Sequence, residues 1–188
     1  MVIGLFFGSF NPLHRAHLKL AEDFFRAAQM DELWWMVSPQ NPHKSPEDLA
    51  PFHHRLAMLR EAIQTPHQRV SDFELFLPAP SYTLDTLRAL QQKYPDHQWK
   101  ILMGQDSWNA LPSWKSGDLI ESQFEIWVYE RPQGEALRAG RFHLLPSILM
   151  DISSTQIRNQ IRGNTEWKPI PELLDCTAAY IAKHQLYQ

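Results

Sequence analysis

A chain of 188 residues with a net charge of -3 and a single cysteine excludes several classes of protein. The charge gives no overall basic field for nucleic acid, and one cysteine cannot build a disulfide framework or a CxxC zinc site. No apolar run approaches the length of a membrane span and no basic leader precedes the first one, so we expect a cytoplasmic protein without membrane or nucleic-acid partners. The length suits one domain, residues 1–188.

Short apolar runs alternate with helical patterns along the chain. Six runs rich in Val, Ile, Phe and Trp predict strands at Val2–Phe7, Glu32–Val37, Arg69–Phe76, Trp99–Met103, Glu125–Tyr129 and Phe142–Leu145. Helices are expected at Leu18–Ala28, Pro51–Ile63, Tyr82–Tyr94 and Leu119–Ser122, then from near Ser153 and near Pro171. The alternation predicts an α/β fold: a doubly wound, mostly parallel sheet with helices on both faces and a helical C-terminal end. Ligands bind such a sheet at the carboxyl ends of its strands.

The first strand leads into Gly8-Ser9-Phe10-Asn11-Pro12, followed by His14 and His17. Gly8 has no Cβ, so it tolerates positive φ and lets a ligand approach the backbone. The spacing of the histidines places both imidazoles on one side of a helix start, where free N–H groups and the helix dipole favour an anion. Two surface histidines at a helix cap are the simpler interpretation of the pair alone. The strand and Gly-Ser turn before it favour a phosphate site.

A second segment, Ile152-Ser153-Ser154-Thr155-Gln156-Ile157-Arg158, has the composition of a helix N-terminus. Ser153 or Ser154 is a natural N-cap, and hydroxyls with unpaired amides form an anion site. Arg158 follows about one turn later, where its guanidinium can bind a di- or triphosphate through two N–H groups. An ordinary capped helix with a solvated arginine explains the segment equally well.

Three further candidates follow strands or precede helices. The loop after the second strand ends in His43 and Lys44, two cations for a substrate phosphate, although a polar loop is the better explanation of this segment alone. Asp106 follows Gly104 at the end of a strand, where a carboxylate suits ribose hydroxyls or caps a helix. Trp114 needs support from outside the sequence to count as a ligand-stacking ring. Cys176 lies on an amphipathic pattern, so we expect a buried apolar role rather than a nucleophile.

Together these segments resemble one family. The first and second segments look like the two signatures of the HxGH nucleotidyltransferase superfamily, and the pieces between them are similar to bacterial nicotinate-mononucleotide adenylyltransferases. The similar pieces are Pro42-His43-Lys44, Asp72-Phe73-Glu74, Pro80-Ser81-Tyr82-Thr83-Leu84-Asp85-Thr86-Leu87, Gly104-Gln105-Asp106-Ser107, Leu111-Pro112-Ser113-Trp114 and Glu130-Arg131-Pro132. They keep the family's order from residue 3 to residue 187.

The resemblance implies a Rossmann-like nucleotidyltransferase that moves AMP from ATP onto nicotinate mononucleotide. It implies catalytic roles for His14, His17 and Arg158, and ATP contacts for Gly8, Ser9, Phe10, Asp106, Ser153, Ser154 and Thr155. For the mononucleotide it implies phosphate contacts from His43 and Lys44, an amide from Thr83 for the nicotinate carboxylate, and stacking by Trp114. It implies Mg²⁺ held mainly by ATP phosphates, with no protein residue assigned as a metal ligand, and it is compatible with a homo-oligomer.

The chain departs from the family pattern at a few positions. Ala16 stands where the family usually has glycine, and Asn11 replaces the commoner aspartate. Neither change removes a group with an implied chemical role, so we expect activity to survive. The alternatives are another acceptor, nicotinamide mononucleotide or phosphopantetheine, and a non-catalytic nucleotide sensor. A sensor would be marked by loss of His17 or Arg158, and both are present.

Overall fold

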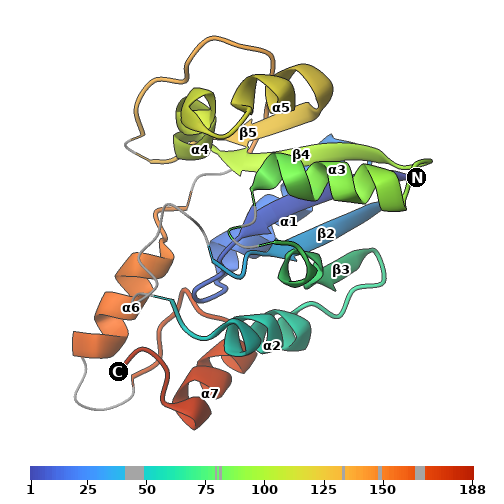
Figure 1. Ribbon diagram of the computed structural model, residues 1–188. Coiled ribbons are helices and arrows are strands. Elements are labelled where there is room, and N and C mark those ends of the chain that lie inside the picture. Colours follow the sequence, from blue (N-terminus) through green and yellow to red (C-terminus); the bar gives the residue numbers. More distant parts are fainter. Residues whose placement is uncertain (41–48, 79, 81, 133, 148–149, 164–167) are drawn as a thin grey trace.

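The computed structural model describes residues 1–40, 49–78, 80, 82–132, 134–147, 150–163 and 168–188 (Figure 1). Its described strands form one parallel six-stranded sheet in the order β3-β2-β1-β4-β5-β6. The strands are β1 (Val2–Gly8), β2 (Glu32–Val37), β3 (Gln68–Ser71), β4 (Gln98–Gly104), β5 (Glu125–Tyr129) and β6 (His143–Leu144). This is the doubly wound order, and its direction reverses between β1 and β4, which is where such sheets bind ligands. The predicted fold class is confirmed.

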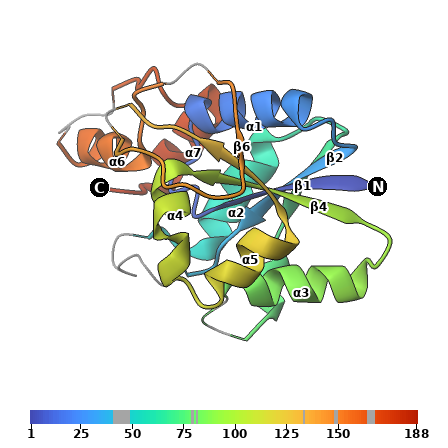
Figure 2. The same cartoon turned by 90° about the horizontal axis from the view of Figure 1, so that it is seen from above.

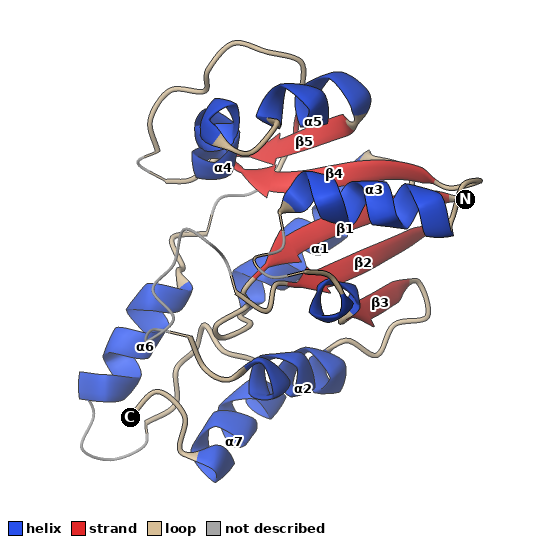
Figure 3. Ribbon diagram, viewed as in Figure 1, coloured by secondary structure: helices blue, strands red, loops and turns tan. Residues whose placement is uncertain are grey.

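The helices connect and flank these strands (Figure 3). They are α1 (Arg15–Ala27), α2 (Phe52–Ala62), α3 (Thr83–Lys93), α4 (Gln105–Ala110), α5 (Gly117–Gln123), α6 (Ser154–Gly163) and α7 (Asp175–His184), with 3₁₀ turns η2 (Phe73–Phe76) and η3 (Leu111–Ser113). The predicted C-terminal helices are present as α6 and α7. The second of these begins at Asp175, four residues after the Pro171 that was expected to open it.

The two faces of the sheet are covered by different helices, as Figure 2 shows from above. On one face Leu87 of α3, Trp108 of α4 and Ile120 of α5 pack against the sheet. On the other face Phe24 of α1 and Leu59 of α2 do so. All five side chains are almost completely buried, which removes their apolar surface from water and holds the layers together.

A third apolar cluster joins the C-terminal helices to α2. Ile157 and Ile161 of α6 and Ile181 of α7 are buried in the same cluster as Met58 of α2. Through this contact α6, which carries the second signature segment, is held beside the first signature at the end of β1 (Figure 1).

The predicted strand Arg69–Phe76 is wrong over its second half. Strand β3 ends at Ser71, opposite Met36, so its partner β2 has one residue left and the ladder runs out. The Phe73 N–H donates to the Ser71 hydroxyl at 3.3 Å, a local bond that competes with strand pairing. The chain then forms η2, which leaves Phe76 exposed rather than buried in a strand.

Two smaller expectations also differ. Cys176 is half-buried on α7 rather than fully buried. The predicted strand Phe142–Leu145 shortens to His143–Leu144, which pairs with β5 at the edge of the sheet.

Candidate active site

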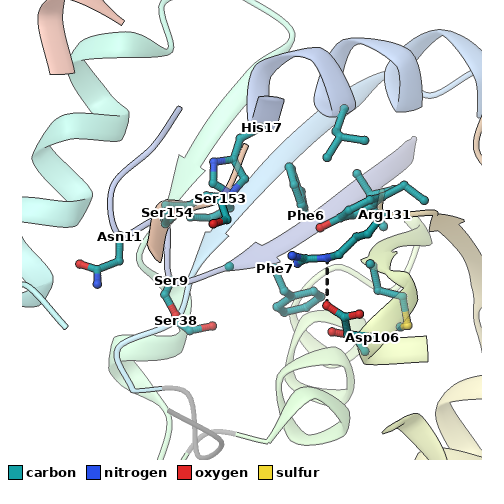
Figure 4. Close-up of a pocket in the computed structure, with 18 of the residues that line it drawn as sticks. Phe6, Phe7, Ser9, Asn11, His17, Ser38, Asp106, Arg131, Ser153 and Ser154 are labelled. Carbon is teal, nitrogen blue, oxygen red and sulfur yellow. Dashed lines mark ion pairs between the residues drawn. The ribbon is translucent and has the colours of Figure 1, made fainter. Parts of the chain in front are cut away.

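A cavity of about 1070 Å³ lies at the carboxyl ends of β1 and β4, where the strand order reverses (Figure 4). Its wall contains twelve of the residues singled out in the sequence: Gly8, Ser9, Phe10, His14, His17, Thr83, Asp106, Trp114, Ser153, Ser154, Thr155 and Arg158. His43 and Lys44 lie outside the described residues. Side chains that are far apart in sequence therefore meet in one cavity, at the place that the fold provides for a ligand.

The turn after β1, residues Gly8–Asn11, forms one wall and is called the β1 turn below. Gly8 does not use the positive φ that glycine tolerates, since no glycine in the described chain has one, and Phe10 takes the left-handed conformation instead, with φ of 46°. A Cβ on Gly8 would lie 2.7 Å from the Phe10 ring. Glycine is therefore needed here for the close approach of an aromatic side chain, not for its own backbone conformation.

The two histidines stand in the first turn of α1 and differ in their surroundings. His14 is the N-cap and His17 is three residues later, with the rings stacked at 3.7 Å between centroids. The His14 backbone N–H donates to His17 Nδ1 at 3.3 Å, so a neutral His17 carries its proton on Nε2. Burial, assisted by the positive charge of Arg131, lowers the pKa of His14 to about 4. At neutral pH His14 is therefore an uncharged group, and its buried Nδ1 has no protein partner among the described residues.

The second signature docks directly on the first. Ser153 caps α6: the Gln156 N–H donates to its hydroxyl at 3.2 Å, and its own N–H donates to Gln156 Oε1 at 2.8 Å, a capping box. The Ser154 hydroxyl donates to the Pro12 carbonyl at 3.0 Å. Arg158 Nη1 donates to the Asn11 carbonyl at 2.9 Å, while its buried Nε has no protein partner in the described chain. The β1 turn and the N-terminal end of α6 thus form one unit with polar hydrogen atoms available to an anion.

Asp106 faces the same cavity from α4, where it lies in the first turn rather than at the cap, which is Gly104. Its Oδ2 forms an ion pair with Arg131 Nε at 2.9 Å (Figure 4). In the sequence, Arg131 stands out only as part of the family-like piece Glu130-Arg131-Pro132, with no role of its own. The signal that could have found it is its position two residues after the end of β5, because Asp106 was selected from the same position after β4.

The start of α3 and η3 also contribute to the cavity wall. Thr83 is the first residue of α3, and half-buried Trp114 directly follows η3 as its C-cap. Glu74 belongs to a family-like piece of the sequence that was given no role; it is a buried carboxyl in the cavity wall, and burial raises its pKa. The Thr86 hydroxyl donates to Glu74 Oε1 at 2.8 Å, which links η2 to the first turn of α3.

The C-terminal end of the chain also reaches the β1 turn, which the sequence did not indicate. The Tyr187 hydroxyl donates to Asn11 Oδ1 at 2.9 Å, and the Ala50 N–H donates to the same oxygen at 3.0 Å. Burial raises the pKa of Tyr187, so it remains a donor. Asn11 therefore accepts from two segments through its side chain and from Arg158 through its carbonyl.

The described part of the chain holds neither a metal-ligand cluster nor a membrane-spanning helix. Within it no cluster of three His, Cys, Asp or Glu side chains has the arrangement to hold a metal ion. None of its helices combines the length and apolarity that crossing a bilayer requires.

Comparison with known proteins decides the family. Residues 5–160 match the model of a family described as cytidylyltransferase-like. A Cytophaga hutchinsonii protein named a probable nicotinate-nucleotide adenylyltransferase is 40% identical over 166 residues, covering 86% of each chain. A Bacteroides fragilis protein of the same name is 41% identical over 162 residues, covering 84% of this chain and 81% of that one. The chain belongs to the nicotinate-nucleotide adenylyltransferase family.

Solved structures agree on the fold of this adenylyltransferase family member. The Plasmodium falciparum nicotinic acid mononucleotide adenylyltransferase complexed with NaAD superposes with a TM-score of 0.81 at 21% identity, covering 99% of this chain and 97% of that one. A putative nicotinate-nucleotide adenylyltransferase from Vibrio parahaemolyticus gives 0.67 at 17% identity, covering 96% of this chain and 98% of that one. The whole described chain, including α6 and α7, therefore follows one shared architecture.

Proposed function

We propose that the protein transfers AMP from ATP to nicotinate mononucleotide, giving nicotinate adenine dinucleotide and pyrophosphate in NAD biosynthesis. The observation behind this proposal is the single cavity that gathers both signature segments with Thr83 and Trp114. Relatives that are 40% and 41% identical over most of the chain bear the name of this activity.

In this reaction a phosphate oxygen of the mononucleotide attacks the α-phosphorus of ATP, and the bond from that phosphorus to the bridging oxygen breaks. Pyrophosphate leaves with the bonding electrons, and no bond to the protein forms. Charge on the leaving oxygens is stabilised by donors in fixed positions. His17 Nε2–H is the main donor in the transition state, and neutral His14 donates beside it. Arg158 with Ser153, Ser154 and Thr155 holds the β- and γ-phosphates.

The remaining contacts are divided between the two substrates. The backbone of Gly8, Ser9 and Phe10 lines the ATP half of the cavity, and Asp106 binds the adenylate ribose. For the mononucleotide, His43 and Lys44 bind the phosphate, the Thr83 amide at the start of α3 binds the nicotinate carboxylate, and Trp114 stacks on the pyridine ring. A helix N-terminus favours a carboxylate, which supports the nicotinate form over the nicotinamide form.

Magnesium belongs to the substrate in this proposal. The described residues offer no cluster of three metal-binding side chains. They are therefore compatible with an ion that is coordinated by phosphates and water rather than by a protein cage. Bound there, it supplies further neutralisation of phosphate charge. The proposal includes a cytoplasmic location, because the reaction consumes ATP, and leaves the number of subunits to a solution measurement.

The proposal is tested by pyrophosphate release from ATP and Mg²⁺ with nicotinate mononucleotide, nicotinamide mononucleotide or phosphopantetheine as acceptor. A strong preference for the nicotinate substrate is the expected result. Preference for another acceptor would keep the ATP half of the site and overturn the roles of Thr83 and Trp114. No release with any acceptor, from protein that binds ATP, would favour the nucleotide sensor.

A further inference from the structure

Arg55, on α2, is a buried arginine that does not line the cavity. Only 1% of it is exposed, and its guanidinium donates to four backbone carbonyls from different parts of the chain. Nε donates to Ala50 at 2.9 Å, Nη1 to Ser9 and to Ser38 at 2.8 Å each, and Nη2 to Pro39 at 2.8 Å. One side chain therefore joins the β1 turn, the residues after β2 and the segment before α2.

This cation has no carboxylate partner among the described residues, since its hydrogen bonds all end on carbonyl oxygens. Burial lowers the pKa of Arg55 to about 10, so the group is still positively charged at neutral pH. A buried charge is costly unless it is well hydrogen-bonded, and a planar guanidinium suits four carbonyls as an ammonium cannot. The site therefore specifies arginine rather than any cation.

The contact with Ser9 has a direct consequence for the cavity wall. The Ser9–Phe10 peptide is trans, since Asn11–Pro12 is the one cis bond in the described chain. In a trans peptide the C=O and the following N–H point in opposite directions. With the Ser9 carbonyl on Arg55, the Phe10 N–H points away from Arg55, and both Ser9 and Phe10 line the cavity.

The hydrogen bond from Arg55 to the Ser9 carbonyl also fixes the backbone next to Phe10, a residue in a strained conformation. Phe10 has φ of 46°, a conformation that persists in a bulky residue only where the surroundings enforce it. Its ring is held by Phe6 and Trp35, with centroids 5.4 and 5.3 Å away. Its backbone is fixed on the N-terminal side through the Ser9 carbonyl and Arg55.

We propose that Arg55 is a positioning residue for AMP transfer, which keeps the Ser9–Phe10 peptide turned so that its N–H faces the ATP phosphates. The inference rests on the proposed function, because it assigns the β1 turn to ATP. Arg55 touches no substrate. It acts through the β1 turn, and through Ser38 it also sets the distance from that turn to the wall after β2.

The test compares Arg55→Lys, Arg55→Ala and a matched control, Arg60→Ala. Arg60 lies on the same helix but is exposed, with an ion pair to Asp72. Misplacing a phosphate donor by about 1 Å can cost about a hundredfold in rate. We therefore expect kcat/KM for ATP to fall about tenfold in Arg55→Lys and about a hundredfold in Arg55→Ala. Arg60→Ala should match the wild type.

Chemical rescue separates positioning from general loss of stability. Millimolar guanidinium chloride should restore part of the activity of Arg55→Ala, because the free ion can bind the same carbonyls, and sodium chloride at equal ionic strength should not. Rescue by both salts, or a wild-type kcat/KM in folded Arg55→Lys, would overturn the proposal.

Hydrogen exchange gives a readout that does not depend on the reaction. In Arg55→Lys, which keeps the charge and is the variant to use if Arg55→Ala does not fold, residues 8–11 should exchange faster while α3 is unchanged. Unchanged exchange at residues 8–11 would overturn the proposal. If the wild-type protein did not transfer AMP, the proposed function would be overturned instead. Hydrogen exchange at residues 8–11 would still decide whether Arg55 fixes the β1 turn.

Discussion

At the scale of single residues, the site separates two histidines that look alike in sequence. His14 is buried beside Arg131 and stays neutral, whereas His17 receives a backbone N–H on Nδ1 and keeps its proton on Nε2. Both are therefore donors at neutral pH without being equivalent. The difference comes from burial and from one hydrogen bond, neither of which the spacing of the two residues can reveal.

Replacing His17 with alanine should reduce kcat about a hundredfold or more, because it removes a donor fixed at the phosphates. The measurement is steady-state pyrophosphate release, with circular dichroism to confirm that the variant is folded. His67→Ala is the matched control, since His67 is exposed and outside the cavity wall. Wild-type turnover in folded His17→Ala would remove His17 from the mechanism.

His14 should make the protein less stable in mild acid. Its pKa is about 4 when folded and 6.5 when unfolded, so between these values the unfolded state binds more protons. Burial of neutral His14 therefore does not lower the free energy of unfolding above pH 6.5. As the pH falls through 6.5 towards 4, the free energy of unfolding decreases, by at most about 3 kcal/mol from this residue.

Urea unfolding of the wild type and of His14→Gln, at pH 7 and at pH 4.5, measures this effect. The wild type should lose more stability than the variant over that interval, whereas His67→Gln should follow the wild type. If the wild type and His14→Gln lost equal stability, burial of His14 would have no effect on its protonation.

At the scale of elements, the sequence predicted what depends on local pattern and missed what depends on partners. The sheet strands β1, β2, β4 and β5 were found to within one residue, because continuous apolar runs mark strands buried on both faces. The apolar run through Phe76 was misread, since its end is set by the length of β2 across the sheet. Likewise the motifs located the cavity wall, but they gave no role to Arg55, Glu74 or Tyr187, whose hydrogen bonds join distant segments of the chain.

Replacing Trp114 with alanine tests whether the cavity wall next to η3 binds nicotinate mononucleotide. Stacking of a base on an aromatic ring is worth about 1–3 kcal/mol, so Trp114→Ala should raise KM for nicotinate mononucleotide about tenfold or more while KM for ATP stays nearly constant. Phe76→Ala, an exposed aromatic residue outside the cavity wall, controls for loss of a ring. A selective rise in KM for ATP would instead place Trp114 at the adenylate end.

At the scale of the whole molecule, the candidate active site is built in part on the C-terminal helix α6. From α6, Arg158 contacts the β1 turn at Asn11 and Ser154 contacts the next residue, Pro12, and α6 and α7 share a buried cluster with α2. Length and composition predicted a single domain of 188 residues, and nothing in the motifs showed which apolar residues would join its parts. The cluster around Met58 is the buried contact that joins α6 and α7 to α2.

Ile181→Ala tests whether the chain unfolds as one unit. Ile181 is 1% exposed, so truncation should cost about 2–5 kcal/mol through lost burial and the cavity left behind. Six of the seven tryptophans lie between residues 34 and 127, so fluorescence reports mainly on the sheet, while circular dichroism includes α6 and α7. In a single domain both signals should shift together in urea. A shift in circular dichroism alone would mean that the C-terminal helices unfold separately, and AMP transfer should then be lost before the sheet melts.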